Sequence, residues 1–394
     1  MNLIKKTENL SHFVCLGDKC EDTCCQKWSM QLDEATHSLY KREAPELLSA
    51  VEAAEEAPWI MRKDPASGFC VKLEGGLCGI HAKYGDSFLG DACYFYPRVT
   101  RTLGSETLMT ATMSCPEIAR LALFENKITV LEPANMPRLP STLRNYLPDG
   151  MDTEDAMQVH QAFLDATKDS TASAEQIYLR IASASRSLER IDTPSWKMMA
   201  PFYLQHADMR LQPAQHHIAD AYNLLHALSG LIVASRRPPT PRLMQTIVEM
   251  ETALAAKLTW GDNVLISIDE LNLPNFERAK QLWKEEGAAF YAQILRNWLQ
   301  MQLSLALYPY SGLGATLSER ITIIGVRLAT IKLALLSNYN IARTSVSQDV
   351  VVRIVQGLSR FLDHLGDPAL SLSIYTETGW VKEERMRGLL HFEA

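Results

Sequence analysis

The stretch ITIIGVRLATIKLAL, residues 321–335, carries the clearest structural signal in the chain. Its apolar residues Ile321, Ile324, Leu328, Ile331 and Leu335 recur at steps of three and four. Because an α-helix has 3.6 residues per turn, this spacing places the five side chains on one face of a helix. The stretch therefore predicts a helix that packs this face against a core.

The same periodicity extends over most of the chain after about residue 150. Prolines and glycines such as Pro238, Pro239, Gly261 and Pro309 are credible helix stops. Runs of alternating β-branched residues, which would indicate strands, are scarce. We expect an α-helical domain over residues 151–394. Its other predicted helices are Gln215–Ser235, Pro241–Leu258, Asn275–Leu307 and Asp349–Leu365.

Residues 1–120 have a different character, with short segments punctuated by glycine and proline. We expect one sustained helix here, over Asp33–Ala57, and a short helix near Glu117–Phe124. The proline-bearing stretch Pro133–Pro148 predicts a linker over residues 121–150. A region that builds so small an apolar core depends on other sources of stability, such as a bound metal.

Composition and charge exclude several classes of protein. The chain has 394 residues, and 39 Lys and Arg against 46 Asp and Glu give a net charge of -7. This balance offers no basic footprint for nucleic acid or anionic lipid. The longest uncharged stretch, Asn297–Ser318, is too polar and too broken to span a bilayer. The N-terminus MNLIKK lacks the apolar segment of an export signal, so we expect a cytoplasmic protein.

All eight cysteines lie in the first 115 residues. A reducing compartment favours metal binding or redox chemistry over disulfides for such a cluster. The predicted fold class is therefore mainly α, with an irregular cysteine-rich metal-binding N-terminal region followed by an α-helical domain. The candidate metal ligands are Cys15, Cys20, Cys24, Cys25, Cys70, Cys78, Cys93 and Cys115.

Two metals suit these residues. In a helical turn, Cys20 and Cys24 would project from one face because they are four residues apart. Zinc usually binds pairs of CxxC-type knuckles, and no such pair exists here. An iron–sulfur cluster accepts irregular spacings and one distant cysteine. Zinc and unmetallated thiols remain alternatives to the cluster.

Four strings of the N-terminal region resemble the flagellin lysine-N-methylases, the FliB-like proteins. They are FVCLGDKCEDTCCQKWSM, FCVKLEGGLCGIHAKYGD, DACYFYPRV and SCPEIARLAL, and the later string LRNWLQMQLSLALYPYS is also similar. The resemblance covers about 115 residues closely and includes a CxxxCC-type iron-chelating region. It places the family's cysteines on all eight cysteines of this chain but does not say which four bind iron.

The resemblance implies an S-adenosylmethionine-dependent protein-lysine N-methyltransferase that acts on lysine ε-amines of flagellin. It also implies a [4Fe–4S] cluster, with zinc as the alternative metal. In this interpretation the domain over residues 151–394 recognises flagellin. A second interpretation is a non-enzymatic helical scaffold for protein binding, stabilised by zinc or an iron–sulfur cluster.

Neither catalytic nor cofactor-binding residues can be assigned from motifs. A radical S-adenosylmethionine enzyme would show the motif CxxxCxxC. This chain has Cys20, Cys24 and Cys25 instead, with the spacing CxxxCC. It also lacks the GxGxxG loop of the common α/β methyltransferases. The cysteine-rich region does contain other polar and aromatic candidates. His81 is a candidate metal ligand, and Trp28 is expected to pack over the cysteines. Asp91, Tyr94 and Tyr96 are candidate pocket residues or bases. Arg98 and Arg101 are candidate partners of a cofactor carboxylate.

Overall fold

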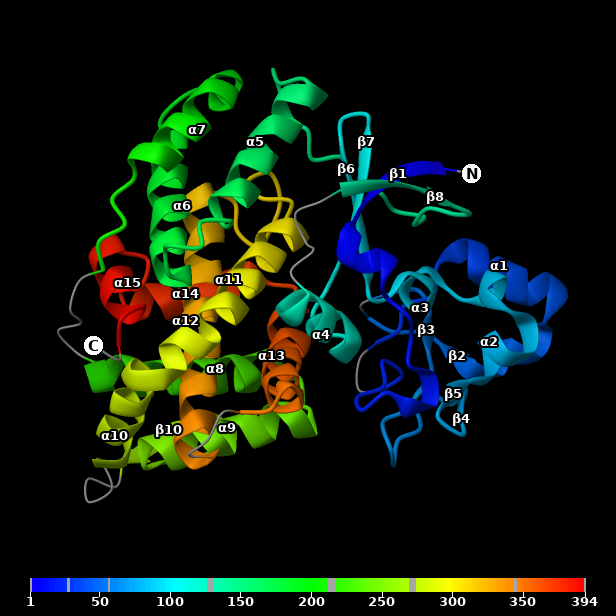
Figure 1. Ribbon diagram of the computed structural model, residues 1–394. Helices are drawn as coiled ribbons and strands as arrows, with labels where there is room; N and C mark the ends of the chain where they lie inside the picture. Colours follow the sequence, from blue (N-terminus) through cyan, green and yellow to red (C-terminus); the bar gives the residue numbers. More distant parts are fainter. Residues whose placement is uncertain are drawn as a thin grey trace.

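The computed structural model describes residues 2–26, 29–55, 57–125, 131–211, 217–268, 274–342 and 346–392. A large helical body lies beside a smaller lobe (Figure 1). A four-stranded sheet and helix α4, Pro116–Phe124, lie between the two. The expected mainly α fold is confirmed. The metal-binding character of the N-terminal region and the domain boundaries at residues 120 and 150 stay predictions.

The predicted helix around residues 321–335 is the centre of the body. It is α12, Leu317–Ala342, and it packs against α6, Ala174–Leu188, and α9, Pro241–Leu254. Gly325 permits the close approach of α6, because a Cβ atom there would collide with the Tyr178 ring. The Tyr178 hydroxyl donates to the carbonyl of Ile321 at 3.0 Å.

Local sequence signals set where several helices begin. The Asp152 side chain caps α5, Thr153–Ala166, and the Ser173 and Gln176 side chains form a capping box at α6. The remaining helices of the body are α7 Trp196–His206, α8 His217–Ser235, α10 Pro274–Leu282, α11 Ala288–Leu305, α13 Gln348–Leu362, α14 Pro368–Glu377 and α15 Glu383–Leu389. A 3-10 turn, Thr193–Ser195, precedes α7, and a π-helical turn, Trp283–Gly287, joins α10 to α11.

Some predicted helices end earlier than expected. The helix expected over Pro241–Leu258 ends at Leu254, because Ala255 adopts a left-handed conformation with φ of 50°. The chain then forms a hairpin of β9, Ala256–Thr259, and β10, Leu265–Ile268. The helix expected over Asp33–Ala57 is α1, Glu34–Glu43 only. Pro45 ends it, since a residue before proline avoids the helical conformation.

The four-stranded sheet is the main element that the sequence did not reveal. Its order is β6, Arg98–Leu103; β7, Glu106–Ala111; β1, Asn2–Thr7; and β8, Leu131–Met136. Strand β1 runs parallel to β7, with Lys5 opposite Leu108, and antiparallel to β8. The expected linker Pro133–Pro148 thus begins inside a strand.

The lobe is built from short elements. Besides α1 it contains helices α2, Gly79–Tyr84, and α3, Asp91–Phe95. Two small hairpins complete it, β2 Val51–Glu52 with β3 Ile60–Met61 and β4 Leu73–Glu74 with β5 Leu77–Cys78. Its 3-10 turns are Pro45–Ala50 and Asp86–Phe88, and Glu8–Ser11 and Gly17–Lys19 precede it in the chain.

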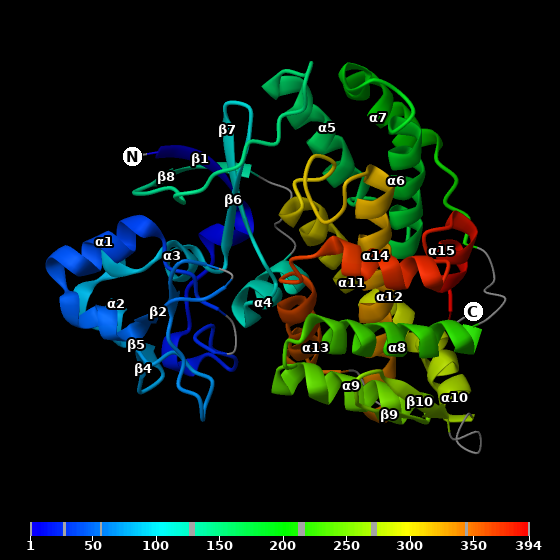
Figure 2. The same ribbon diagram turned by 180° about the vertical axis from the view of Figure 1, so that it is seen from behind.

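The buried apolar side chains form two cores. The larger core runs from Ile4 to Phe392 and joins the sheet and α4 to the helical body. The smaller core lies in the lobe, between Met30 and Ile80. The view from behind shows the same separation, with α1 and α2 far from α8 and α15 (Figure 2).

One helix among the described residues is long and apolar enough to cross a membrane by composition alone. It is the stretch Leu317–Tyr339 of α12, and all of its apolar window is buried inside the molecule. This burial is what the central helix of a folded core requires.

Candidate metal centre

Four of the eight cysteines surround one cavity in the lobe. Cys25, Cys70, Cys78 and Cys93 line a space of about 400 Å³. This set joins Cys25, one of the four cysteines within residues 15–25, to three cysteines that are widely spaced in the sequence. None of the eight cysteines forms a disulfide.

Backbone hydrogen bonds hold the four cysteines in place. The N–H of Cys70 donates to the carbonyl of Cys25 at 2.9 Å. Cys78 ends the β4–β5 hairpin, where it pairs with Leu73, and is the residue before α2. Cys93 lies in α3, whose first N–H, that of Asp91, donates to the Asp33 carboxylate at 2.8 Å. Asp33 also caps α1, so one carboxylate ties both helices to the cavity.

The rest of the cavity wall is mostly apolar. Met30, Leu32, Met61, Ile80 and Leu89 line it. The ring of Tyr40 also lines it, but the Tyr40 hydroxyl is engaged, since it donates to the carbonyl of Phe88 at 2.8 Å. The lining residues include no Asp, Glu or His. Sulfur is therefore the principal ligand-type atom in this cavity.

The surroundings raise the pKa of all four thiols. Burial raises the pKa of Cys93, and the neighbouring Cys25, Cys78 and Cys70 add to the effect. Burial also raises the pKa of Cys70 and Cys78. The adjacent Cys24 thiol, followed by burial, raises the pKa of Cys25. The four side chains are thus neutral thiols without a cation, and a bound metal would be needed to hold them as thiolates.

Cys15, Cys20 and Cys115 form a second neighbourhood near α4. Burial raises the pKa of Cys115 to about 12, and the charges of Cys20 and Cys15 contribute. Cys115 is the residue before α4, where the N–H groups of Ile118 and Glu117 oppose this rise. Cys20 and Cys15 likewise influence each other. The sequence separates the cysteines into an early and a late group, but the fold mixes the two groups.

In the parts of the chain that the structure describes, no three His, Cys, Asp or Glu side chains form a group that holds a metal ion directly. The four thiols of the lobe line a common cavity without closing on one point. The donor set still fits a soft metal centre by its chemistry. Thiolates bind iron–sulfur clusters and zinc, and an apolar wall restricts the access of water.

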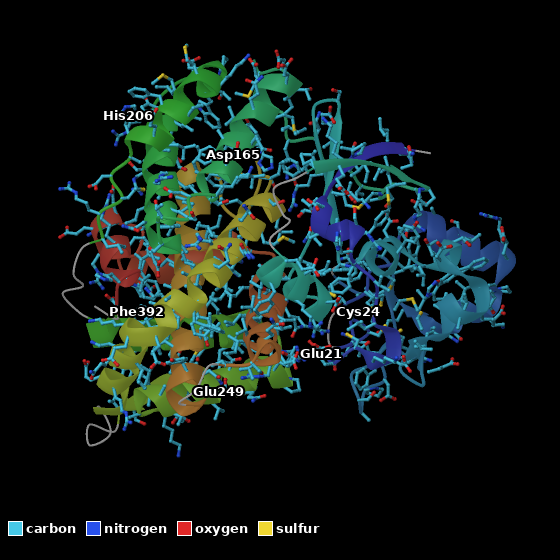
Figure 3. The ribbon with its side chains drawn as sticks, viewed as in Figure 1. Glu21, Cys24, Asp165, His206, Glu249 and Phe392 are labelled. Atoms are coloured by element: carbon cyan, nitrogen blue, oxygen red, sulfur yellow. The ribbon has the colours of Figure 1, made fainter. Side chains whose placement is uncertain are left out.

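The loop that carries Cys20, Cys24 and Cys25 is not helical, and helix α13 of the body fixes it. Arg360 of α13 donates to the Asp22 carboxylate at 2.7 Å and to the carbonyls of Thr23 and Gln26 at 3.1 and 2.9 Å. Both members of the ion pair are almost fully buried, with side-chain exposures of 3% for Arg360 and 5% for Asp22. Figure 3 shows Glu21 and Cys24 at this junction of body and lobe.

A second α13 residue connects the loop to the other cysteine neighbourhood. The amide of Gln356 donates to the Asp22 carboxylate at 2.6 Å and to the carbonyl of Ser114 at 2.9 Å. Ser114 directly precedes Cys115 and lies 3.1 Å from Nε2 of His364. One helix of the body therefore positions the backbone next to cysteines of both neighbourhoods.

The other residues predicted from the sequence occupy different places. His81 is exposed and does not line the cavity. The Asp91 carboxylate pairs with Arg138 and accepts from the N–H of Ser141 at 2.6 Å, so it is already engaged. The Arg138 guanidinium also lies over the Tyr94 ring, 4.5 Å from its centroid. Asp91 and Tyr94 thus brace the turn that carries Cys93.

Tyr96 is buried, and its hydroxyl lies 3.2 Å from the hydroxyl of Ser114. Burial raises the pKa of Tyr96 well above its usual value. The Arg98 guanidinium stacks over Phe13, and Arg101 lines a separate cavity next to the sheet. Trp28, expected to pack over the cysteines, lies outside the described residues.

The sequence did not point to Arg360 or Gln356. Both are ordinary polar residues in an amphipathic helix more than 300 positions away from Asp22. The one available signal was Asp22 itself, a carboxylate between Cys20 and Cys24. A carboxylate in that place is explained only when its partner is known.

Two curated proteins of Salmonella are similar to parts of this chain. Flagellar biosynthetic protein FliU of Salmonella muenchen is 26% identical over 148 residues, which cover 35% of this chain and 86% of that protein. Lysine-N-methylase of Salmonella choleraesuis (strain SC-B67) is 27% identical over 120 residues, or 28% of this chain. The chain spans 29% of the length of that methylase. No protein-family model and no solved structure matches the chain.

Proposed function

We propose that this protein is an S-adenosylmethionine-dependent protein-lysine N-methyltransferase that acts on flagellin. The observation that carries the activity is the partial similarity to a protein named Lysine-N-methylase. The similarity to a flagellar biosynthetic protein supports flagellin as the substrate. We assign substrate recognition to the helical domain over residues 151–394, which offers a large surface for a protein partner.

We assign a [4Fe–4S] cluster to the lobe, with Cys25, Cys70, Cys78 and Cys93 as its ligands. The four residues line one cavity, and they are the thiols that would hold the group. When bound, the cluster supplies a rigid tie between four short segments and an electron-accepting centre. Zinc bound to the same thiols is the alternative, and visible absorption near 400 nm distinguishes the two metals because zinc has none.

Methyl transfer to lysine requires a neutral amine. The pKa of a free lysine, about 10.4, makes deprotonation at pH 7 cost about 4.6 kcal/mol. Two of the three bases expected from the sequence are not suited to this task, since Asp91 is paired with Arg138 and burial raises the pKa of Tyr96. The third, Tyr94, packs its ring against the Arg138 guanidinium. Desolvation of the entering lysine is therefore the means by which we expect the enzyme to lower the pKa of that amine.

Transfer of a labelled methyl group from S-adenosylmethionine to purified flagellin tests the activity. The full-length protein is expected to label flagellin, but not flagellin whose lysines have first been acetylated. Equal labelling of both substrates would contradict a lysine methylase. No labelling by protein that has kept its metal would instead favour the scaffold.

The assignment of the ligands is tested with two serine variants of the same loop. Cys25→Ser is expected to lose most of the bound metal, and Cys20→Ser to keep most of it, because only Cys25 lines the cavity. Metal content after anaerobic purification gives the measurement. Loss of metal in Cys20→Ser with retention in Cys25→Ser would show that the neighbourhood near α4 holds the metal.

A further inference from the structure

A second, smaller cavity lies where the sheet meets α5 and α11. Its wall includes Arg101 of β6, Thr7 of β1, His160 of α5 and Ser304 of α11. These side chains come from four separate segments, and none belongs to the cysteine cavity. Strands of the sheet and two helices form most of the wall, so the packed fold, and not a loop, determines the shape of the cavity.

Arg101 brings a positive charge into this cavity without a carboxylate to neutralise it. Its guanidinium donates to the carbonyl of Leu305 and lies 6.0 Å from the centroid of the Tyr146 ring. Burial lowers the pKa of Arg101, and no Asp or Glu of the described segments forms an ion pair with it. The buried Arg360 and Arg327 differ in this respect, since they pair with Asp22 and Asp363. Arg101 itself is only partly buried, so water still reaches it, but with no carboxylate beside it the guanidinium can bind an anion from outside the chain.

A hydroxyl without a partner points to the same conclusion. Thr7 is 1% exposed, lines the cavity, and its Oγ1 has no hydrogen-bond partner among the described residues. The nearby hydroxyls of Ser304 and Thr110 satisfy each other at 3.1 Å. An unsatisfied buried hydroxyl is unfavourable, and a ligand oxygen would accept its hydrogen bond.

His160 adds an acceptor to the cavity. Burial lowers its pKa, so the ring is neutral, and its Nδ1 lies 2.6 Å from the carbonyl of Tyr308. Nδ1 must therefore carry the proton, and Nε2 has a lone pair that accepts a hydrogen bond. Leu307, another wall residue, has φ of 45°, a conformation that costs energy in a residue with a side chain.

We propose that this cavity binds the α-amino carboxylate end of a small molecule. The Arg101 guanidinium and the Thr7 hydroxyl bind the carboxylate, and Nε2 of His160 accepts from the ammonium group. The cavity is far smaller than the sites that enclose a whole drug-sized ligand, which measure about 300–1,000 Å³, so it takes only the end of its ligand. The choice of ligand rests on the proposed function, because S-adenosylmethionine and S-adenosylhomocysteine both carry an α-amino carboxylate group.

The test measures binding of S-adenosylhomocysteine to the full-length protein by titration calorimetry. Arg101→Met is expected to weaken binding about 10- to 100-fold, the loss of one charge-assisted hydrogen-bonded pair. Arg144→Met is the matched control, because Arg144 is exposed and stacks on the same Tyr146 ring at 5.2 Å. It is expected to bind like the wild type. Equal affinity in Arg101→Met and wild type would overturn the proposal.

Thr7→Val keeps the shape of the side chain and removes only the hydroxyl, so it serves if Arg101→Met does not fold. It is expected to fold with at least wild-type stability and to bind S-adenosylhomocysteine several-fold more weakly. Unchanged affinity in this variant would contradict the role of Thr7 in the site.

A second probe, acetate, separates this proposal from the proposed function. Acetate is expected to raise the melting temperature of the wild type above that in chloride of equal ionic strength, and to do so less for Arg101→Met. If acetate acts through Arg101 while S-adenosylhomocysteine does not bind, the carboxylate site stands and the cofactor assignment fails. If neither probe distinguishes wild type from Arg101→Met, the site itself is refuted.

Discussion

The lobe and the helical body achieve stability by different means. Among the described residues, the lobe core has nine buried apolar side chains, and three of the cysteines around its cavity, Cys25, Cys78 and Cys93, pack only partly buried against it. The body core extends through α12 and includes fully buried Trp298 and Trp380. The body also buries charges in pairs, such as Lys332 with Glu175 at 2.6 Å. The comparison shows a region that is stable through packing beside one that is arranged around a cavity and anchored from outside.

The largest effect is expected from removing Arg360, which holds the cysteine loop on α13. Arg360→Met leaves the Asp22 carboxylate buried without its cation and removes the bonds to the carbonyls of Thr23 and Gln26. We expect a loss of about 3–5 kcal/mol in the free energy of unfolding. Urea denaturation measures this loss, and the rate of thiol modification by a disulfide reagent measures exposure of Cys24 and Cys25.

Arg353→Met is the control on the same helix. Arg353 pairs with Glu249 at 2.7 Å, and this pair ties α13 to α9 rather than to the cysteine loop. It should lower stability by a smaller amount and leave thiol reactivity unchanged. Equal thiol exposure in both variants would mean that Arg360 has no special part in holding the loop.

A leucine in the small core tests whether the lobe unfolds separately. Leu47 is 2% exposed, and Leu47→Ala is expected to cost about 2–3 kcal/mol, the lower part of the range for buried leucines, because the core around it is small. Hydrogen exchange should accelerate in residues 30–93 and not in α12. The half-buried neighbour Leu48 provides the control, with a smaller effect expected for Leu48→Ala. Acceleration throughout the body would show that the two regions unfold as one unit.

The free energy of unfolding is expected to fall in acid because of His364, which lies where α13 of the body meets the cysteine-rich region. Burial, then the charges of Arg360, Arg237 and Arg327, lowers the pKa of His364 to about 4 from its usual 6.5. Between these values the unfolded chain binds a proton that the folded chain does not, so stability falls as pH drops from about 6.5 to 4. We expect a loss on the order of 1–3 kcal/mol, measured as urea stability against pH. His364→Gln should flatten this profile, and an unchanged slope would exclude His364 as its source.

The smallest effect is expected at the surface of the lobe. Lys83 lies 3.5 Å from the Glu46 carboxylate, and both side chains are more than half exposed. An exposed pair of this kind contributes little because water and salt screen it. Lys83→Ala should leave the urea midpoint unchanged within error. A clear decrease would mean that the lobe depends on surface charge more than its burial suggests.

Periodicity predicted helices α8 to α13 of the body, because apolar side chains recur along each of them, although α12 is buried on every side rather than on one face. The predictions were wrong where distant contacts or single residues intervene. Strand β1 pairs with β8 about 130 residues away, and neither is long or apolar enough to reveal itself. The end of α9 depends on the left-handed Ala255, a conformation that residue type does not favour.

Sequence alone determined that the chain is mainly helical and that its eight cysteines are concentrated in the first 115 residues. Only the tertiary structure decided which cysteines lie together. Cys25 lines the cavity with Cys70, Cys78 and Cys93, while its neighbour Cys24 does not, and Cys20 lies near Cys115. The physical reason is that the loop has no repeating geometry of its own, so contacts with Arg360 and Gln356 more than 300 residues away direct its side chains.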